Sequence, residues 1–130
     1  MRLKTIMADG LLCSATLVPS FAQESSAANP SGVFRDSYGT TFTFSLCGDG
    51  ADLCGVLNDV QGRSRTEDNL AYVGEQVMQA EKAGPNEWQG TVIFDGRQAS
   101  ATVTQTGPNT VEIQGCRGIF CQTLEFDRVS

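Results

Sequence analysis

The sequence predicts an all-β fold, an antiparallel up-and-down β-barrel of about seven or eight short strands that is disulfide-bonded. Three observations predict it. Apolar and hydroxyl side chains alternate with a period of two in several segments. Turn-forming residues separate those segments, in a chain with 14 glycines and 4 prolines. Cysteines after the N-terminal region lie in two close pairs.

The first predicted hairpin covers residues 40–47 and 53–60. Phe42, Phe44 and Leu46 alternate with hydroxyl side chains in the first of these strands, as a half-buried strand requires. A glycine-rich turn then leads into the second strand. The two strands are therefore expected to form a hairpin, with one cysteine on each side of its turn.

The middle of the chain is harder to interpret. Residues 61–69 are polar and charged, which favours a surface loop. Residues 72–80 have apolar positions that would also suit a helix, but Gly74 weakens a helix and the stretch is short. We therefore expect a strand or an irregular segment there.

The C-terminal half alternates strands with strong turn signals. Asp95-Gly96 is a tight-turn dipeptide, and Gly-Pro-Asn occurs twice, at 84–86 and at 107–109. The strands predicted between these turns cover residues 87–94, 98–105, 110–116 and 120–129. Strands spaced this evenly form a closed barrel or a sandwich, and closure removes the edges on which strands aggregate.

The N-terminus has the layout of an export signal, expected over residues 1–22. Two positive charges precede a mostly apolar stretch, and small residues, Ser20 and Ala22, stand before the expected cut. The stretch is too short for stable membrane insertion, although Asp9 within it is unusual. A flexible leader over 23–31 and one domain over 32–130 would follow, in a periplasmic or secreted protein.

The chain has five cysteines, and four remain once the export signal is removed with Cys13. Cys13 is a poor site for a lipid anchor because the bulky Leu12 precedes it. An even number in an oxidising compartment indicates two disulfides. Three pairings are possible, and the local one is favoured because each close pair brackets a turn. A zinc site or a redox-active pair is disfavoured by the absence of CxxC spacing. The four disulfide candidates are Cys47, Cys54, Cys116 and Cys121.

Charge and composition exclude several functions. The formal net charge is −6 with no cluster of basic residues, which argues against nucleic acid. The chain has no histidine, so histidine-based catalysis and histidine-ligated zinc are excluded. We expect no enzyme activity, no metal and no cofactor.

Acidic residues offer weak candidate sites. Asp49 and Asp52 suggest a calcium loop but lack the ligand number that calcium requires. Carboxylate pairs for acid–base chemistry would make the chain a hydrolase, the least favoured hypothesis. Surface charge is the simpler interpretation of these possible pairs, which are Glu67 with Asp68, and Asp95 with Glu125 and Asp127.

Aromatic residues offer the main candidate for a ligand pocket. A barrel of about eight strands is just wide enough for its side chains to fill it or for one small ligand. The alternative is that these aromatics only fill the interior. Arg128 is expected to close one end of the barrel by pairing with a carboxylate. The pocket-lining candidates are Phe42, Phe44, Trp88 and Phe94.

Four local patterns carry a family resemblance: Gly32-Val33-Phe34, Leu46-Cys47-Gly48 through Leu53-Cys54-Gly55, Glu87-Trp88-Gln89-Gly90 with Phe94-Asp95-Gly96, and Gly115-Cys116 through Cys121-Gln122-Thr123 with Arg128-Val129. Through them the chain resembles the small exported bacterial proteins called domain of unknown function 2147. The resemblance implies a lipocalin-like barrel in the cell envelope with no known activity. The family's Asn-Pro-rich middle segment and its closing Trp-Thr-Arg are absent here.

Two functional hypotheses follow. The first is a non-enzymatic envelope protein that binds a small apolar ligand or a partner protein. The second is a structural or stress-related interaction module with a filled barrel and no ligand. A molecule that co-purifies with the exported protein would separate them.

Overall fold

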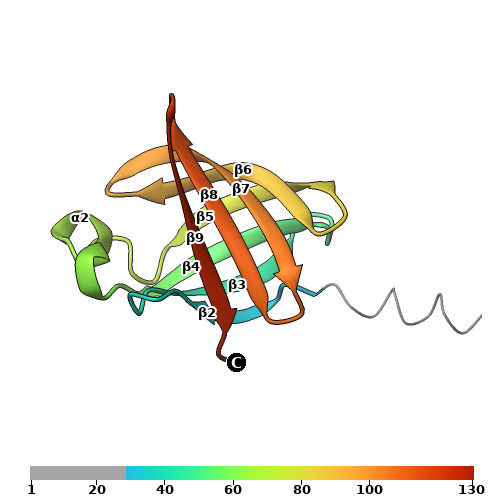
Figure 1. Cartoon of the computed structure of the whole chain (residues 1–130), viewed down its shortest axis with the longest axis horizontal. Helices are drawn as coiled ribbons and strands as arrows, with labels where there is room; N and C mark the ends of the chain where they lie inside the picture. The colour runs from blue at the N-terminus through green and yellow to red at the C-terminus, as the bar shows by residue number, and fades with distance from the viewer. Residues whose placement is uncertain (1–28) are drawn as a thin grey trace, which may run out of the picture.

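Each strand pairs with its sequence neighbours in the computed structural model, and the last strand returns to pair with the first (Figure 1). The structure describes residues 29–130. Within them, the strands form one closed antiparallel barrel, so the predicted up-and-down barrel is confirmed and the sandwich is excluded. The strands are β2 (Gly32–Arg35), β3 (Thr41–Cys47), β4 (Asp52–Asp59), β5 (Gln76–Gly84), β6 (Glu87–Phe94), β7 (Arg97–Gly107), β8 (Thr110–Arg117) and β9 (Phe120–Arg128).

Closure depends on the short strand β2. Phe34 lies opposite Phe42 of β3 on one side and opposite Arg128 of β9 on the other. Phe34 is fully buried, so the strand that joins the two edges also contributes an aromatic ring to the core.

The strand directions give the barrel two different ends. One end carries the β2–β3, β4–β5, β6–β7 and β8–β9 connections, and we call it the open end. The other carries the β3–β4, β5–β6 and β7–β8 turns together with the C-terminus, and we call it the closed end. In Figure 1 strand β9 runs from the open end to the closed end, where the C-terminus lies.

The prediction of a surface loop over residues 61–69 is wrong in part. This region forms the 3-10 helix η3 (Gly62–Ser64) and most of the helix α2 (Glu67–Leu70). Thr66 caps α2 by accepting a hydrogen bond from Asn69 N, an ordinary N-cap arrangement. The ambiguous stretch that follows begins as a turn and becomes strand β5 at Gln76. No helix in the described residues is long and apolar enough to cross a membrane.

The predicted export signal, Cys13 and most of the predicted leader lie outside the described residues. The end of the leader packs against the barrel. Pro30 is buried, and the Arg128 guanidinium donates hydrogen bonds to the carbonyls of Asn29 and Ser31. Residues 29–31, the last of the predicted leader, therefore contact the barrel.

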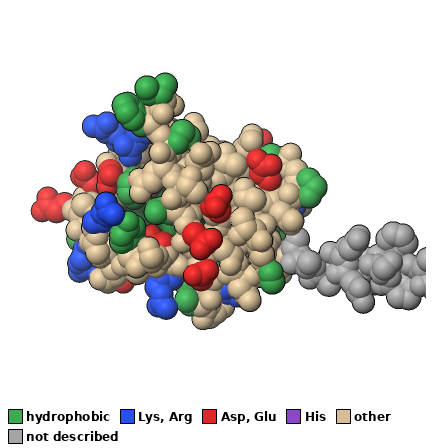
Figure 2. All heavy atoms as spheres, in the orientation of Figure 1, with side chains coloured by type: hydrophobic (Ala, Val, Ile, Leu, Met, Phe, Trp, Pro, Cys, Tyr) green, Lys and Arg blue, Asp and Glu red, His purple; other side chains and the backbone are tan. Residues whose placement is uncertain are grey.

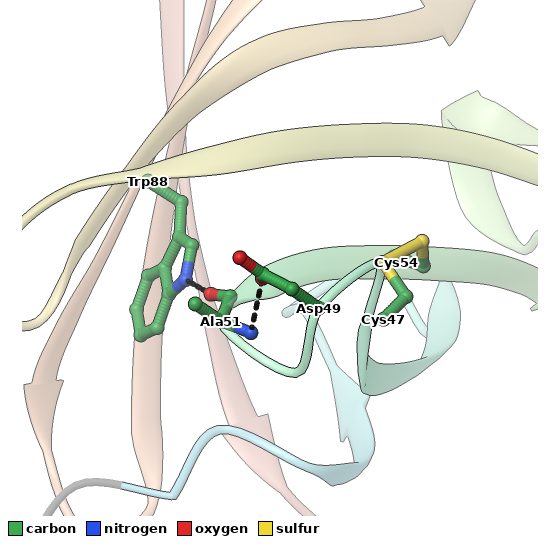
Figure 3. Close-up of a disulfide and its surroundings, with 5 residues drawn as sticks. All are labelled: Cys47, Asp49, Ala51, Cys54 and Trp88. Atoms are coloured by element: carbon green, nitrogen blue, oxygen red, sulfur yellow. Dashed lines mark hydrogen bonds between the residues drawn. A yellow bond between two sulfur atoms is a disulfide. The ribbon is translucent and has the colours of Figure 1, made fainter.

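Both disulfides are local. Cys47 and Cys54 join β3 to β4 at the closed end, with their Cα atoms 6.0 Å apart (Figure 3). Cys116 and Cys121 face each other across the β8–β9 hairpin at the open end, with a Cα separation of 4.1 Å. Because the two pairs lie at opposite ends of the barrel, they do not form a four-cysteine zinc site.

Candidate functional site

A cavity of about 300 Å³ occupies the half of the barrel nearest the open end. Its volume is at the lower limit for small-molecule pockets, which span about 300–1,000 Å³. It has room for about ten groups the size of a water molecule. The walls are mostly apolar and come from Phe42, Leu57, Val60, Val77, Val92, Ala99, Ile113, Leu124 and Phe126.

The half of the barrel nearest the closed end is filled. Trp88 is 1% exposed, and its indole Nε1 donates a 2.8 Å hydrogen bond to the Ala51 carbonyl (Figure 3). The Lys82 ammonium lies 4.5 Å from the centre of the indole ring. Phe34 and Phe44 pack together with their ring centroids 5.4 Å apart. These aromatic rings form a floor beneath the cavity.

The four predicted pocket residues therefore divide between two roles. Phe42 and Phe94 line the cavity, whereas Phe44 and Trp88 are not among its lining residues. Phe44 follows Phe42 on the same inward row of β3, one step nearer the closed end. The period-two pattern identifies an inward row but does not say how deep in the barrel each member lies.

Polar side chains from the β2–β3 connection enter the cavity at the open end. Asp36 is 7% exposed and Thr40 is 6% exposed, and both line the cavity. Asp36 Oδ1 accepts hydrogen bonds from the backbone N–H groups of Tyr38 and Thr40, each at 2.9 Å. Asp36 Oδ2 and Thr40 Oγ1 are buried and have no hydrogen-bond partner among residues 29–130. Sequence reasoning missed both residues, although Asp36 follows the inward-facing Phe34 by two positions.

Arg117 ends the inward row of β8, which begins with Val111 and Ile113. Its guanidinium donates a hydrogen bond to the Phe94 carbonyl, and its Nε is buried without a partner. Among residues 29–130, the only ion pair joins Arg65 and Asp59 at 3.9 Å. Arg117 therefore lines the cavity without a carboxylate partner.

Helix α2 is hydrogen-bonded to the β6–β7 turn beside the cavity. Asn69 Nδ2 donates to Asp95 Oδ1 at 3.1 Å and to the Ser64 carbonyl at 2.9 Å. The Asp95 N–H donates in return to Asn69 Oδ1 at 2.9 Å. Ser64, Asn69 and Asp95 all line the cavity. The segment that contains η3 and α2 is thus a fixed part of the cavity rim.

The tip of the β8–β9 hairpin is apolar and exposed. Ile119 is 90% exposed and Phe120 is 78% exposed, and Phe120 also lines the cavity. Figure 2 shows hydrophobic side chains gathered at this tip, with basic side chains beside them. The Cys116–Cys121 disulfide ties the base of the tip.

The Asp95, Glu125 and Asp127 carboxylates do not come together as one group. Asp95 lies at the open end, whereas Asp127 lies opposite Thr110 at the closed end. Asp49 accepts a 3.1 Å hydrogen bond from the Ala51 N–H, which stabilises the β3–β4 turn (Figure 3). No group of three or more acidic or cysteine side chains within residues 29–130 is arranged to hold a metal ion.

Arg128 closes its end of the barrel, but the predicted carboxylate partner is wrong. Its guanidinium donates to the carbonyls of Asn29 and Pro108 at 2.8 and 3.1 Å and to Asn109 Oδ1 at 3.0 Å. The same group lies 4.7 Å from the centre of the Phe34 ring. Carbonyls take the place of a carboxylate because the N-terminal segment and the β7–β8 turn meet at this point.

Comparison with known proteins finds no matching family model, no matching curated protein and no matching solved structure. The resemblance to domain of unknown function 2147 stays a prediction.

Proposed function

We propose that this protein is a non-enzymatic binding protein that holds one small, largely apolar molecule in the open half of its barrel. The cavity of about 300 Å³ carries the proposal. Empty apolar space destabilises a protein, by about 24 cal/mol for each Å³ in measured cavity mutants. A barrel with only a structural role would be more stable if it were filled.

Small side chains maintain this space. Ala99 and Gly115 line the cavity on the inward rows of β7 and β8, and a larger side chain at either position would occupy it. The opposite half of the barrel shows that the same fold can be filled, because Trp88 and Phe44 pack there at 1% exposure each.

The proposal includes export to a periplasmic or extracellular compartment and membership of the domain of unknown function 2147 family. Two disulfides support an oxidising compartment, because such bonds are rare in a reducing cytosol. The absence of histidine from the chain and the dispersal of Asp95, Glu125 and Asp127 favour binding over catalysis.

Native mass spectrometry of the protein purified from periplasm tests this function. We expect a chain with both disulfides intact and an additional small molecule that is lost on denaturation. Titration of the emptied protein with n-octanol should then shift the NMR methyl signals of Val77, Val92 and Ile113. A protein that is always empty and shows no such shifts would overturn the proposal.

A second candidate function is binding of a partner protein in the envelope. The observation that favours it is the exposure of Ile119 and Phe120 at the β8–β9 tip. Cross-linking in the periplasm should then trap a defined partner with the unmodified chain but not with the Ile119→Ser, Phe120→Ser double variant. Equal cross-linking by both proteins would exclude a role for this tip.

A further inference from the structure

We propose that the molecule in the cavity is a small amine with an apolar tail, and that Asp36 and Thr40 hold its ammonium group. This inference rests on the proposed binding function and specifies the chemical class of the ligand. It is carried by the two polar oxygens that line the cavity without a partner, Asp36 Oδ2 and Thr40 Oγ1.

The local backbone positions the Asp36 carboxylate whether or not a ligand is bound. Oδ1 accepts hydrogen bonds from the N–H groups of Tyr38 and Thr40, both at 2.9 Å. These two bonds leave Oδ2 as the free acceptor. Because Asp36 is 7% exposed, solvent hydrates this oxygen poorly, and an unpaired buried carboxylate oxygen is strongly unfavourable. A donor from a ligand would remove that penalty.

Thr40 supplies a second oxygen on the same connection. Its backbone N–H is bonded to Asp36 Oδ1, so the two side chains are held in a fixed relation. Its hydroxyl is buried and unpaired. An ammonium group has three hydrogens to donate and no acceptor, and this matches two oxygens on hydrogen-bonded residues of one connection that both lack donors.

The remaining charges at the cavity rim favour a cation over an anion. Asp95 adds a second carboxylate to the lining. Against these two carboxylates, Arg117 is the only basic residue that lines the cavity within residues 29–130. Its guanidinium donates to the Phe94 carbonyl, while its Nε is buried without a partner. The net charge of the whole chain, −6, also attracts cations over a longer range.

The arrangement of polar and apolar walls orients the ligand. Most polar lining residues belong to the connections at the open end, and Arg117 and Gln122 lie where β8 ends and β9 begins, whereas the walls toward the floor are apolar. An amphiphile would therefore enter tail first and leave its head beside Asp36. A cavity of about 300 Å³ fits a tail of roughly eight carbons, taking each carbon as about the size of a water molecule.

Three probes with the same tail test the head group: n-octylamine, n-octanol and sodium octanoate, each titrated calorimetrically into the mature, disulfide-bonded protein. We expect octylamine to bind about tenfold or more tightly than octanol, the size of effect that a charge-assisted hydrogen bond gives. Octanoate should bind most weakly, because Asp36 repels it.

Asp36→Asn is the decisive variant. The amide oxygen can still accept the two backbone N–H groups, but an N–H donor replaces the free Oδ2. We expect octylamine affinity to fall about tenfold or more while octanol affinity changes little. Asp49→Asn is the matched control, because Asp49 also accepts a backbone N–H in a turn but lies at the closed end. It should leave all three affinities unchanged.

Thr40→Val supplies a second test if Asp36→Asn does not fold. The hydroxyl makes no hydrogen bond to any residue in the range 29–130, so its loss should spare the fold and still weaken octylamine binding by severalfold. Equal binding of the three probes would overturn this inference and leave the proposed function standing. Tightest binding of octanoate, lost in Arg117→Gln, would overturn it in favour of an anionic ligand. Binding of none of the three would overturn the proposed function itself.

Discussion

At the scale of single residues, the small side chains on the inward rows decide whether the barrel is hollow. Ala99 of β7 lines the cavity, and the next residue, Ser100, points outward and is exposed. Because side chains alternate between the two faces of a strand, a substitution at Ala99 changes the interior, whereas one at Ser100 changes only the outer surface.

Ala99→Leu should fill part of the cavity. We expect it to abolish octanol binding and to raise the free energy of unfolding by about 0.5–2 kcal/mol, as cavity-filling changes commonly do. Calorimetry and urea denaturation measure the two effects. Ser100→Leu adds the same bulk outside and should preserve binding. Unchanged octanol affinity in Ala99→Leu would place the ligand elsewhere.

Arg128 is a second single residue on which the barrel depends. At the closed end, its planar guanidinium donates hydrogen bonds to acceptors on two separate segments. Lysine has no planar group with several fixed N–H donors, so it cannot make the same set of hydrogen bonds. Arg128→Lys should therefore lower the free energy of unfolding by about 2–3 kcal/mol, since hydrogen bonds to several carbonyls are lost.

Urea denaturation would measure the loss, with Arg97→Lys as the control. Arg97 is exposed at the β6–β7 turn, so that change should stay within about 0.5 kcal/mol. Equal stability of Arg128→Lys and Arg97→Lys would show that Arg128 does not hold the closed end together.

At the scale of elements, two hairpins carry similar disulfides but differ in what they support. The Cys47–Cys54 bond ties β3 to β4 beside the filled half of the barrel. The Cys116–Cys121 bond ties the hairpin whose residues Phe120 and Cys121 line the cavity. The first is therefore expected to affect stability alone, and the second both stability and binding.

Replacing each cysteine pair by serines separates these roles. Each double variant should lose about 2 kcal/mol of unfolding free energy, the loop-entropy value for such short loops. Only Cys116→Ser, Cys121→Ser should also weaken octanol binding, because the rim of the cavity then becomes mobile. Calorimetry that finds the same loss of affinity in Cys47→Ser, Cys54→Ser would contradict this division.

At the scale of the whole molecule, up-and-down order collects alternate connections at one end. The open end thereby gains the polar residues of three connections and the apolar β8–β9 tip, while the closed end gains three tight turns and Arg128. One core therefore has a packed half and a hollow half. Trp88, the single tryptophan, lies in the packed half and reports on the fold rather than on the ligand.

Ligand binding should stabilise the whole barrel without disturbing Trp88. At a concentration 100 times its dissociation constant, octylamine should raise the unfolding free energy by about 2.7 kcal/mol. The shift is measured as a later urea midpoint in Trp88 fluorescence, with the native emission spectrum unchanged. A large change in native emission would show that the ligand reaches the floor of the cavity.

Much of the barrel could be predicted from local patterns. Alternation in β3 and β7, the turns at Asp95 and Asn109, and the close cysteine pairs all follow from short-range physics. Helix α2 was missed because four residues have too little periodicity to detect, and only its Thr66 cap marked it.

The candidate site was predicted only in part, because depth within a barrel depends on which strands meet at each level. Phe42 and Phe44 share one inward row, yet one borders the cavity and the other packs into the floor. Asp36 looks like an ordinary turn residue in the sequence. Its second oxygen becomes significant only because closure of the barrel buries it.

Alternation and turn chemistry act over a few residues, so the sequence alone predicted short antiparallel strands and favoured two local disulfides, which the structure confirms. That one half of the barrel is filled and the other hollow became evident only in the folded structure. That difference arises because closure of the barrel brings Trp88, Phe34 and Phe44 together toward one end and leaves small side chains such as Ala99 at the other.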